Sequence, residues 1–241
     1  MSRRVTSLSI TVLCLAISFA AVSAAPQQKV QLARKAKVGD VSRTVTEATM
    51  SANVNGNAMS MGIKEVEKAT VTAVASDGAI TMTAQAESSE MSMMGQTMAG
   101  PPQDPSTLVI RPDNSLVSHS RNDPSKMDAR MSAATHVLFS DKPVGAGDAW
   151  TREIKADAGP GVAANGDYKL VAFEKVGTVD TAKITFTFHE QGAEGIIVSG
   201  TIWVETANGE EVKAEYEVKN LPLSPGVSGT ATVKSSRMAA G

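Results

Sequence analysis

The chain has little cysteine, few aromatic residues and few histidines, and each scarcity limits its chemistry. Cys14 is the only cysteine in 241 residues, so no disulfide can form within one chain. Cys14 also lies in a segment that we expect to be removed on export, which excludes a thiolate nucleophile and a cysteine-ligated metal. The three histidines (His119, His136 and His189) show no HxH or HExxH spacing, so we expect no shared metal site.

A short apolar segment follows two arginines at the N-terminus. Arg3 and Arg4 precede the stretch Leu8–Ala21, and small residues follow it up to Ala25. This stretch of about 14 residues is shorter than the roughly 20 that a membrane-spanning helix needs. A basic start, a short apolar core and small residues at positions −3 and −1 are typical of a secretory signal peptide. We therefore expect cleavage after Ala24, giving a periplasmic or secreted protein without a transmembrane anchor.

Charge is nearly balanced in the rest of the chain. Without Arg3 and Arg4, 21 basic residues face 25 acidic ones. A mildly acidic, well-mixed surface argues against nucleic-acid binding and provides no polybasic patch for a membrane. The sequence contains no nucleophile elbow, phosphate loop or dinucleotide fingerprint. We therefore expect a protein that is not an enzyme and that needs no cofactor.

Turn signals recur at short intervals and separate segments rich in Thr and Val. Asn-Gly or Asp-Gly pairs occur at 55–56, 77–78, 165–166 and 208–209. Apolar and polar residues alternate between these turns, which predicts antiparallel strands with one wet face. In 211–219 the charged side chains from Glu211 onward are expected to face solvent, and His189-Glu190 is expected to be an exposed strand end. We predict a mainly β fold: antiparallel β-meanders of about ten strands forming a curved sheet or half-barrel with one central amphipathic helix.

The helix and the strands divide the chain into successive segments. These are a signal peptide at 1–24, a flexible N-terminal segment at 25–36, a first β-region at 37–122, a helix at 123–139 and a second β-region at 140–237. Asp123-Pro124-Ser125 provides the helix cap and first turn. An apolar stripe then recurs at helical spacing, which predicts that the helix packs on a sheet while His136 faces solvent. The stripe consists of Met127, Met131, Ala134 and Leu138.

The two β-regions differ in composition. Eight methionines lie between Met50 and Met98, whereas all eight aromatic residues after the signal peptide lie between Phe139 and Tyr216. The first region must therefore pack with small and flexible side chains, with its longest loop at 94–106. The second can build an aromatic core. We expect that core to contain Trp150, Phe186, Trp203 and Tyr216.

Short strings recur in the two halves. A string that ends in Gly-Asp begins each half of the chain, Lys37–Asp40 in the first and Pro143–Asp148 in the second. Later in each half, a run of Thr and large apolar residues precedes a turn: Thr107–Ile110 before Asp113-Asn114, and Thr201–Val204 before Asn208-Gly209. Either an ancient duplication of a β-meander or two meanders with the same turn chemistry explains the recurrence.

The string from Phe139 to Trp150 is the most distinctive one in the chain. Pro143, Val144, Gly147, Asp148 and Trp150 form a P-V-x-x-G-D-x-W signature. In this it resembles an uncharacterised family of exported bacterial β-rich proteins, which share the order of β-region, helix or loop, signature and second β-region. That resemblance implies an architecture and no activity. Physically, the signature reads as a turn that Trp150 anchors in the core.

A more distant resemblance is to the lipoprotein-carrier type of fold, in which helices cover a curved antiparallel sheet that holds acyl chains. Export, length, consecutive strands and a central helix with an apolar face carry this resemblance. It implies binding of an apolar small molecule, such as a lipid or acyl chain, or of an envelope partner protein. We expect the groove between helix and sheet to be lined by Met59, Met61, Met82, Met127, Met131 and Leu138.

The methionine cluster allows an alternative function. The spacing of its members resembles the spaced thioethers of exported copper-handling proteins, and thioether sulfur suits Cu(I). On a strand, the i, i+2 spacing also describes any apolar face. The alternative is therefore a periplasmic Cu(I)-binding protein that uses Met59, Met61, Met91, Met93 and Met94.

Overall fold

The computed structural model describes residues 28–54, 56–100, 102–120, 127–156, 162–224 and 226–239. Within these ranges the chain forms fourteen strands and one helix, which confirms the mainly β fold. In chain order they are β1 (Lys29–Val30), β2 (Val41–Val54), β3 (Asn57–Val74), β4 (Ile80–Met93), β5 (Gln96–Ala99), β6 (Ser106–Ile110), β7 (Leu116–Ser120), α1 (Met127–Thr135), β8 (Val144–Gly145), β9 (Ala149–Ile154), β10 (Ala164–Val176), β11 (Val179–Glu190), β12 (Ile197–Glu205), β13 (Glu211–Ser224) and β14 (Val227–Arg237). The expected signal peptide and helix cap lie outside the described ranges.

Twelve of these strands form one antiparallel sheet, and β1 pairs separately with β8. Across the sheet the order is β7-β6-β4-β3-β2-β14-β13-β12-β11-β10-β9, with β5 beside β4. From β2 to β4 and from β9 to β14, strands that follow one another in the chain are neighbours, as hairpin connections require. The last strand, β14, pairs with β2 from Gly229–Ala52 to Arg237–Thr44. The two halves thus form one continuous sheet.

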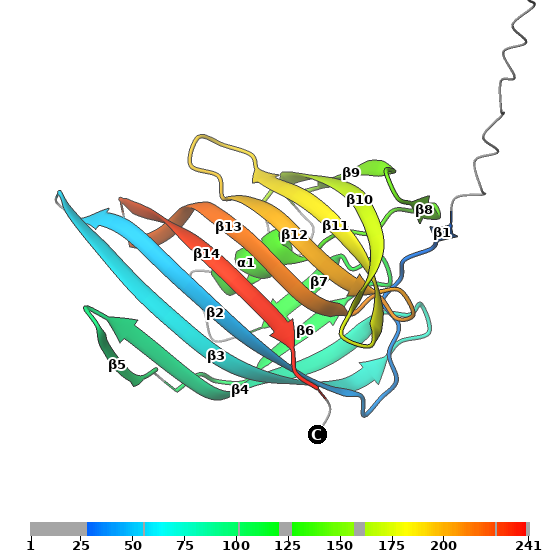
Figure 1. The fold of residues 1–241 in the computed structure, drawn as a ribbon, viewed down its shortest axis with the longest axis horizontal. Coiled ribbons are helices and arrows are strands. Elements are labelled where there is room, and N and C mark those ends of the chain that lie inside the picture. Colours follow the sequence, from blue (N-terminus) through cyan, green and yellow to red (C-terminus); the bar gives the residue numbers. More distant parts are fainter. Residues whose placement is uncertain are drawn as a thin grey trace, which may run out of the picture.

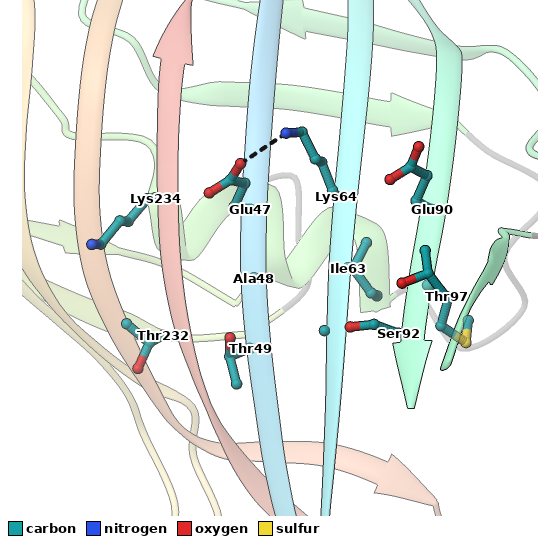
Figure 2. Close-up of a pocket in the computed structure, with 12 residues that line it drawn as sticks. Glu47, Ala48, Thr49, Ile63, Lys64, Glu90, Ser92, Thr97, Thr232 and Lys234 are labelled. Atoms are coloured by element: carbon teal, nitrogen blue, oxygen red, sulfur yellow. Dashed lines mark ion pairs between the residues drawn. The ribbon is translucent and has the colours of Figure 1, made fainter. Parts of the chain in front are cut away.

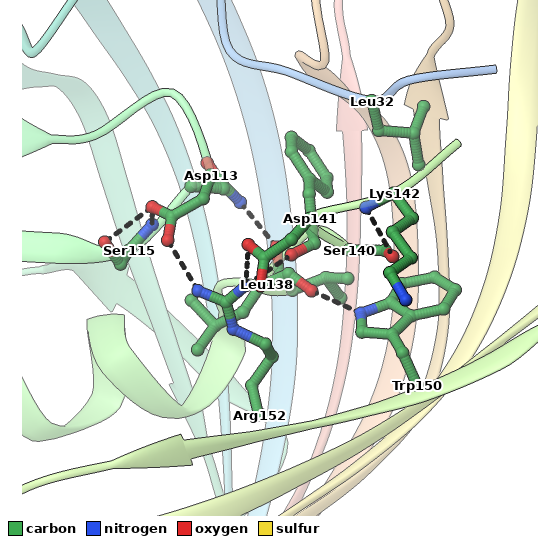
Figure 3. Close-up of polar contacts among 12 residues, drawn as sticks. Leu32, Asp113, Ser115, Leu138, Ser140, Asp141, Lys142, Trp150 and Arg152 are labelled. Carbon is green, nitrogen blue, oxygen red and sulfur yellow. Dashed lines mark hydrogen bonds and ion pairs between the residues drawn. The ribbon is translucent and has the colours of Figure 1, made fainter. Parts of the chain in front are cut away.

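The sheet curves around α1 and remains unclosed, with β7 and β9 at its two edges (Figure 1). At one end, side chains bridge these edges (Figure 3). Arg152 of β9 donates to Asp113, which lies just before β7, at 2.7 Å, and to the Phe139 carbonyl at 3.2 Å. Trp150 donates through Nε1 to the Leu138 carbonyl at 2.7 Å. The chain between α1 and β9 is thereby held between the two edges. We call the face of the sheet toward α1 concave and the opposite face convex.

Each half begins with a turn of the same structure, at 37–40 and at 145–148. In both, the N–H of the first residue donates to the aspartate carboxylate, at 2.7 and 2.9 Å. The glycine before the aspartate has a φ of +92° in both turns, which an L side chain rarely adopts. Its N–H donates to the carbonyl of Val71 in one half, at 2.9 Å, and of Leu170 in the other, at 2.7 Å. A β-bulge follows directly after each of these two residues.

The turns between β6 and β7 and between β12 and β13 also match. Each contains a residue in the left-handed region: Asn114 with a φ of +65° and Gly209 with a φ of +68°. The side chain before it, Asp113 or Asn208, accepts a hydrogen bond from the backbone N–H two residues on, at 3.0 and 2.8 Å. A bulge also follows each turn at the same place, with Val117 and Val212 as the extra residues. These shared turns and bulges favour a duplicated meander over chance recurrence of turn sequences.

The core is unevenly divided between the halves. The main cluster contains most of the inward side chains of β10–β14 together with the chain after α1, and Leu138, Phe139, Ile184 and Val218 are among its buried members. The first half contributes a smaller cluster with one helix residue. Its buried members are Val71, Ile80, Ile110, Leu116 and Ala133. The small side chains of the first half therefore bury less apolar area.

Trp203 departs from the expected aromatic core. It is only 7% exposed, yet it lies on the convex face because its neighbour Ile202 points to the concave face. The Nζ atoms of Lys183 and Lys213 lie 5.1 and 4.6 Å from the centre of its ring. Lysine stems and cation–π contacts thus cover a ring that sequence patterning assigns to the interior. Trp150, by contrast, packs against the main core as expected.

The helix α1 ends at Thr135, before the predicted end of the helix at residue 139. The His136 N–H still donates to the Ser132 carbonyl at 3.1 Å, but the helix does not continue to Leu138. His136 is partly buried instead of facing solvent, and Leu138 is buried in the main core beyond the helix. Within the predicted loop at 94–106, Gln96–Ala99 forms β5 after a tight turn.

Candidate functional site

An extended segment crosses one end of the half-barrel, and we call its residues 29–37 the strap. The Arg34 N–H donates to the Pro112 carbonyl at 2.8 Å, and the Lys35 N–H donates to the Asn208 carbonyl at 2.9 Å. These carbonyls belong to the equivalent turns of the two halves. Leu32 is 2% exposed and anchors the strap in the main core. The sequence assigns residues 25–36 to a flexible segment, whereas here the strap ties the two halves together.

Beside the strap, the concave face contains a cavity of about 410 Å³, which we call the strap cavity. Its volume falls within the range of about 300–1,000 Å³ typical of small-molecule sites. One part of its lining is apolar and comes from β4, β6 and β12. This part includes Met82, Leu108, Ile110, Ile202 and Val204. The other part is polar and includes Arg34, Thr44, Glu65, His119 and Ser132. The cavity is therefore amphipathic.

Arg34 reaches this cavity from the strap. Its Nη2 lies 3.9 Å from the sulfur of Met82, and its Nε is enclosed without a hydrogen-bond partner among the described residues. Burial lowers the pKa of Arg34, while the charges of Glu210 and Glu211 act in the opposite direction. A guanidinium remains charged under these conditions. The cavity therefore contains a cationic donor that the described protein groups do not satisfy.

Two histidines lie at the same cavity. His119 on β7 places its Nδ1 3.1 Å from the hydroxyl of Ser132 on α1, and its Nε2 is enclosed without a partner in the described part of the chain. His136 contacts the Ser132 carbonyl through Nδ1. Burial lowers the pKa of His136, and the charges of Arg34 and His119 lower it further against the effect of the backbone contact. Because enclosed polar atoms usually have partners, the nitrogens of Arg34 and His119 need an explanation.

Glu211 also lines the strap cavity, contrary to the prediction that it faces solvent. The register shifts between Trp203 and Val204, so Val204 pairs with Glu211 and the alternation along β13 changes there. The hydroxyl of Ser235 donates to the Glu211 carboxylate. Burial raises the pKa of Glu211 despite this bond and the nearby Arg34. The carboxyl is therefore easier to neutralise than an ordinary glutamate.

A second feature of the concave face lies where β2, β3, β4 and β5 meet, at the end away from the strap. The strand register places Met61 opposite both Met50 and Met93, and Met91 opposite Met98. These residues share the face of Ile63, which lines the strap cavity. Met59 lies two residues before Met61 on the same face. We call Met50, Met59, Met61, Met91, Met93 and Met98 the methionine surface.

The methionine surface is largely accessible. Met59, Met93 and Met98 are 43%, 37% and 46% exposed. The structure thus groups four of the five methionines of the predicted copper set and adds Met50 and Met98. Met94 departs from the set, because it occupies the β4–β5 turn with a φ of +52° and is 88% exposed.

The six residues of the predicted apolar groove do not form one site. Met82 lines the strap cavity, and Met59 and Met61 belong to the methionine surface. Met127 and Met131 pack against the main core, in which Leu138 is buried. The groove between helix and sheet is therefore filled by core packing at the helix, and the open space lies beside it.

Glu190 corrects a further expectation. It ends β11 but is 2% exposed, and it accepts two hydrogen bonds from Arg130 of α1, at 3.0 and 2.6 Å. The Ile196 N–H donates to the same carboxylate at 2.9 Å. His189 is exposed as expected. The ion pair between Arg130 and Glu190 fixes α1 to the second half of the chain, and this places Ser132 at the strap cavity.

The convex face carries a depression of about 360 Å³ where Gly62 lacks a side chain (Figure 2). Its charged groups include the Glu47–Lys64 ion pair at 3.1 Å, and neighbouring strands contribute Glu90 and Lys234. The depression is open and of mixed charge.

In the described ranges, no group of three His, Cys, Asp or Glu side chains lies close enough together to hold a metal ion. Among those ranges there is also no helix long and apolar enough to cross a membrane.

Comparison with known proteins gives no family. No family model and no curated protein matches the sequence. Among solved structures, the fold is similar to a Bacteroides fragilis NCTC 9343 protein described as exported with a YmcC-like fold, at 13% identity and a TM-score of 0.32, covering 84% of this chain and 97% of that one.

Two further structures show weaker similarity. DynF from the dynemicin biosynthesis pathway of Micromonospora chersina has 6% identity, a TM-score of 0.24 and coverage of 89% of this chain and 85% of its own. A DUF1329 family protein from Desulfovibrio piger ATCC 29098 has 14% identity, a TM-score of 0.17 and coverage of 80% and 83%. All three TM-scores are below 0.5, so function has to be argued from the site itself.

Proposed function

We propose that the protein is an exported, non-enzymatic binding protein that holds an amphipathic small molecule in the strap cavity. One observation carries the proposal: Arg34 and His119 both line the same cavity, and each has an enclosed nitrogen, Nε and Nε2 respectively, without a partner in the described chain. An enclosed donor without a partner costs about 1–3 kcal/mol. A bound acceptor group would remove that cost.

The lining indicates the kind of ligand. Leu108, Ile202 and Met82 provide an apolar surface for a chain or ring, which agrees with the apolar ligand expected from the sequence. Arg34 and His119 favour an end group with acceptor oxygens, such as a carboxylate. Four glutamates also line the cavity. Glu65 accepts a hydrogen bond from Gln103 at 2.7 Å, Glu210 accepts one from Arg237 at 2.9 Å, and the raised pKa of Glu211 reduces the negative charge near Arg34. A single acyl chain with an anionic end is therefore the proposed ligand class.

Ser132 and His119 lie close enough to suggest an acyl-transfer enzyme, with 3.1 Å between Oγ and Nδ1. In such sites the histidine is oriented by a third group that bonds its second nitrogen. The second nitrogen of His119 has no such partner within the described residues. This arrangement favours binding over catalysis.

Titration with dodecanoate by isothermal calorimetry tests the proposal. Leu108 and Val109 are neighbours on β6, and only Leu108 lines the cavity. L108D should lower the affinity at least tenfold, while the matched control V109D should stay within about threefold, because it places the charge on the opposite face. Binding that is absent in the wild type, or equally affected by both substitutions, would contradict the proposal.

A further inference from the structure

The methionine surface has an unusual composition for an apolar patch. Its six large side chains are all methionines, and Ile63 follows Met61 on the same face of β3. The convex residues between them are small or polar, such as Ser60, Gly62 and Ser92. Leucine or valine would supply the same apolar area with better-defined geometry. Sulfur is the property that distinguishes these residues from the alternatives.

The strand register brings three of these sulfurs within reach of one point. Met50, Met61 and Met93 occupy directly opposed positions on the three adjacent strands β2, β3 and β4. Neighbouring strands lie about 4.8 Å apart, and their opposed side chains leave the sheet on the same face. Methionine has three rotatable side-chain bonds, so the outer two thioethers can turn toward the central one. Met91 and Met98 form a second opposed pair one step along the strands.

The side-chain chemistry of the methionine surface suits a soft cation. Lys64, next to Ile63 on β3, points to the convex face and pairs there with Glu47 at 3.1 Å. Thioether sulfur is a soft, neutral donor that selects Cu(I) and similar ions over Mg²⁺, Ca²⁺ or Zn²⁺. The chain provides no competing thiol outside Cys14.

We propose that Met50, Met61 and Met93 form a three-thioether site for a soft monovalent ion, Cu(I) or its redox-stable analogue Ag(I). Met91 and Met98 stand next to it as alternative donors. The site uses different residues from the strap cavity, so the proposal is independent of the function proposed for that cavity. It involves ion binding alone, without an electron-transfer step.

Titration with Ag(I), in a nitrate buffer free of chloride and thiols, is the direct test. We expect native mass spectra to show one added silver ion per chain. Spectra of protein labelled with ¹³C at the methionine methyl groups should show shifted signals for Met50, Met61 and Met93. Met238 is 44% exposed at the other end of the sheet and should not shift. Zn²⁺ should give neither effect.

Substitution separates a sulfur site from an apolar surface. M50L/M61L/M93L keeps the bulk and removes the sulfur, so Ag(I) affinity should fall at least a hundredfold, while M238L should bind as the wild type does. If the triple variant does not fold, M61L/M93L replaces it, because Met50 packs partly on the core. Unchanged Ag(I) binding in the leucine variant, or methyl shifts confined to other methionines, would overturn the proposal. Dodecanoate affinity should be unchanged in these variants.

Discussion

The buried ion pair between α1 and β11 makes the sharpest stability prediction. Glu190 is 2% exposed and Arg130 is 23% exposed by side chain, so the two partners differ in access to water. R130M leaves a buried carboxylate with the Ile196 N–H as its remaining donor. E190Q leaves an arginine that can still reach solvent, and the new amide oxygen can keep the bond to Ile196. We therefore expect R130M and E190Q to lower the free energy of unfolding by different amounts.

The magnitudes follow from that asymmetry. Removing one partner of a buried ion pair typically costs about 3–5 kcal/mol, and R130M should fall in this range. E190Q keeps one hydrogen bond and frees a charge that water can solvate, so we expect about 1–3 kcal/mol.

Urea unfolding at pH 7, followed by the fluorescence of Trp150 and Trp203, measures these losses. The exposed pair Lys175–Asp180, at 61% and 72% exposure, provides the control, and K175M should cause no measurable change. Equal losses for R130M and E190Q, or a loss for K175M as large as that for R130M, would contradict this expectation.

Three further predictions concern the strap end. Because the pKa of Glu211 is raised in the folded state, deprotonation favours unfolding, so the wild type should lose stability relative to E211Q as the pH rises above the ordinary carboxyl value, in urea titrations from pH 4 to 7. The lowered pKa of His136 has the opposite sign: stability relative to H136Q should be lost as the pH falls below the ordinary histidine value, in the same assay from pH 7.5 to 5. G209A should lower the melting temperature clearly more than G177A. Both glycines have a positive φ, but only a Cβ at position 209 would lie 2.6 Å from the Ala33 carbonyl oxygen of the strap.

Local turn chemistry in the sequence predicts much of the fold. The Asn-Gly pair at 55–56 predicts a hairpin, and Val54 pairs with Asn57. Counting back from this pair gives the opposition of Met50 and Met61, which could therefore have been calculated from the sequence. Along β4, the shift around Glu87 changes which residues share a face. It brings Met91 and Met93 onto the same face as Met82, which strict alternation does not give.

The strap cavity could not be assembled from the sequence in the same way. Arg34 lies in a segment without periodicity, and it reaches the site only because the strap bonds to two turns far apart in the chain. Glu211 sits among charged residues whose alternation indicates solvent, and a single bulge reverses its direction. Nothing in the sequence around Glu190 predicts that Arg130 of the helix will bind its carboxylate. Each depends on tertiary contacts that local propensity does not encode.

Native mass spectrometry of the protein, exported by a host cell and purified without detergent, tests directly whether the strap cavity holds a ligand. We expect a bound mass in the range of single-chain amphiphiles, which persists in V109D and is lost in both L108D and R34M. A wild-type protein that carries no such mass and also fails to bind added dodecanoate would contradict the proposal. So would a bound mass that L108D and R34M both retain.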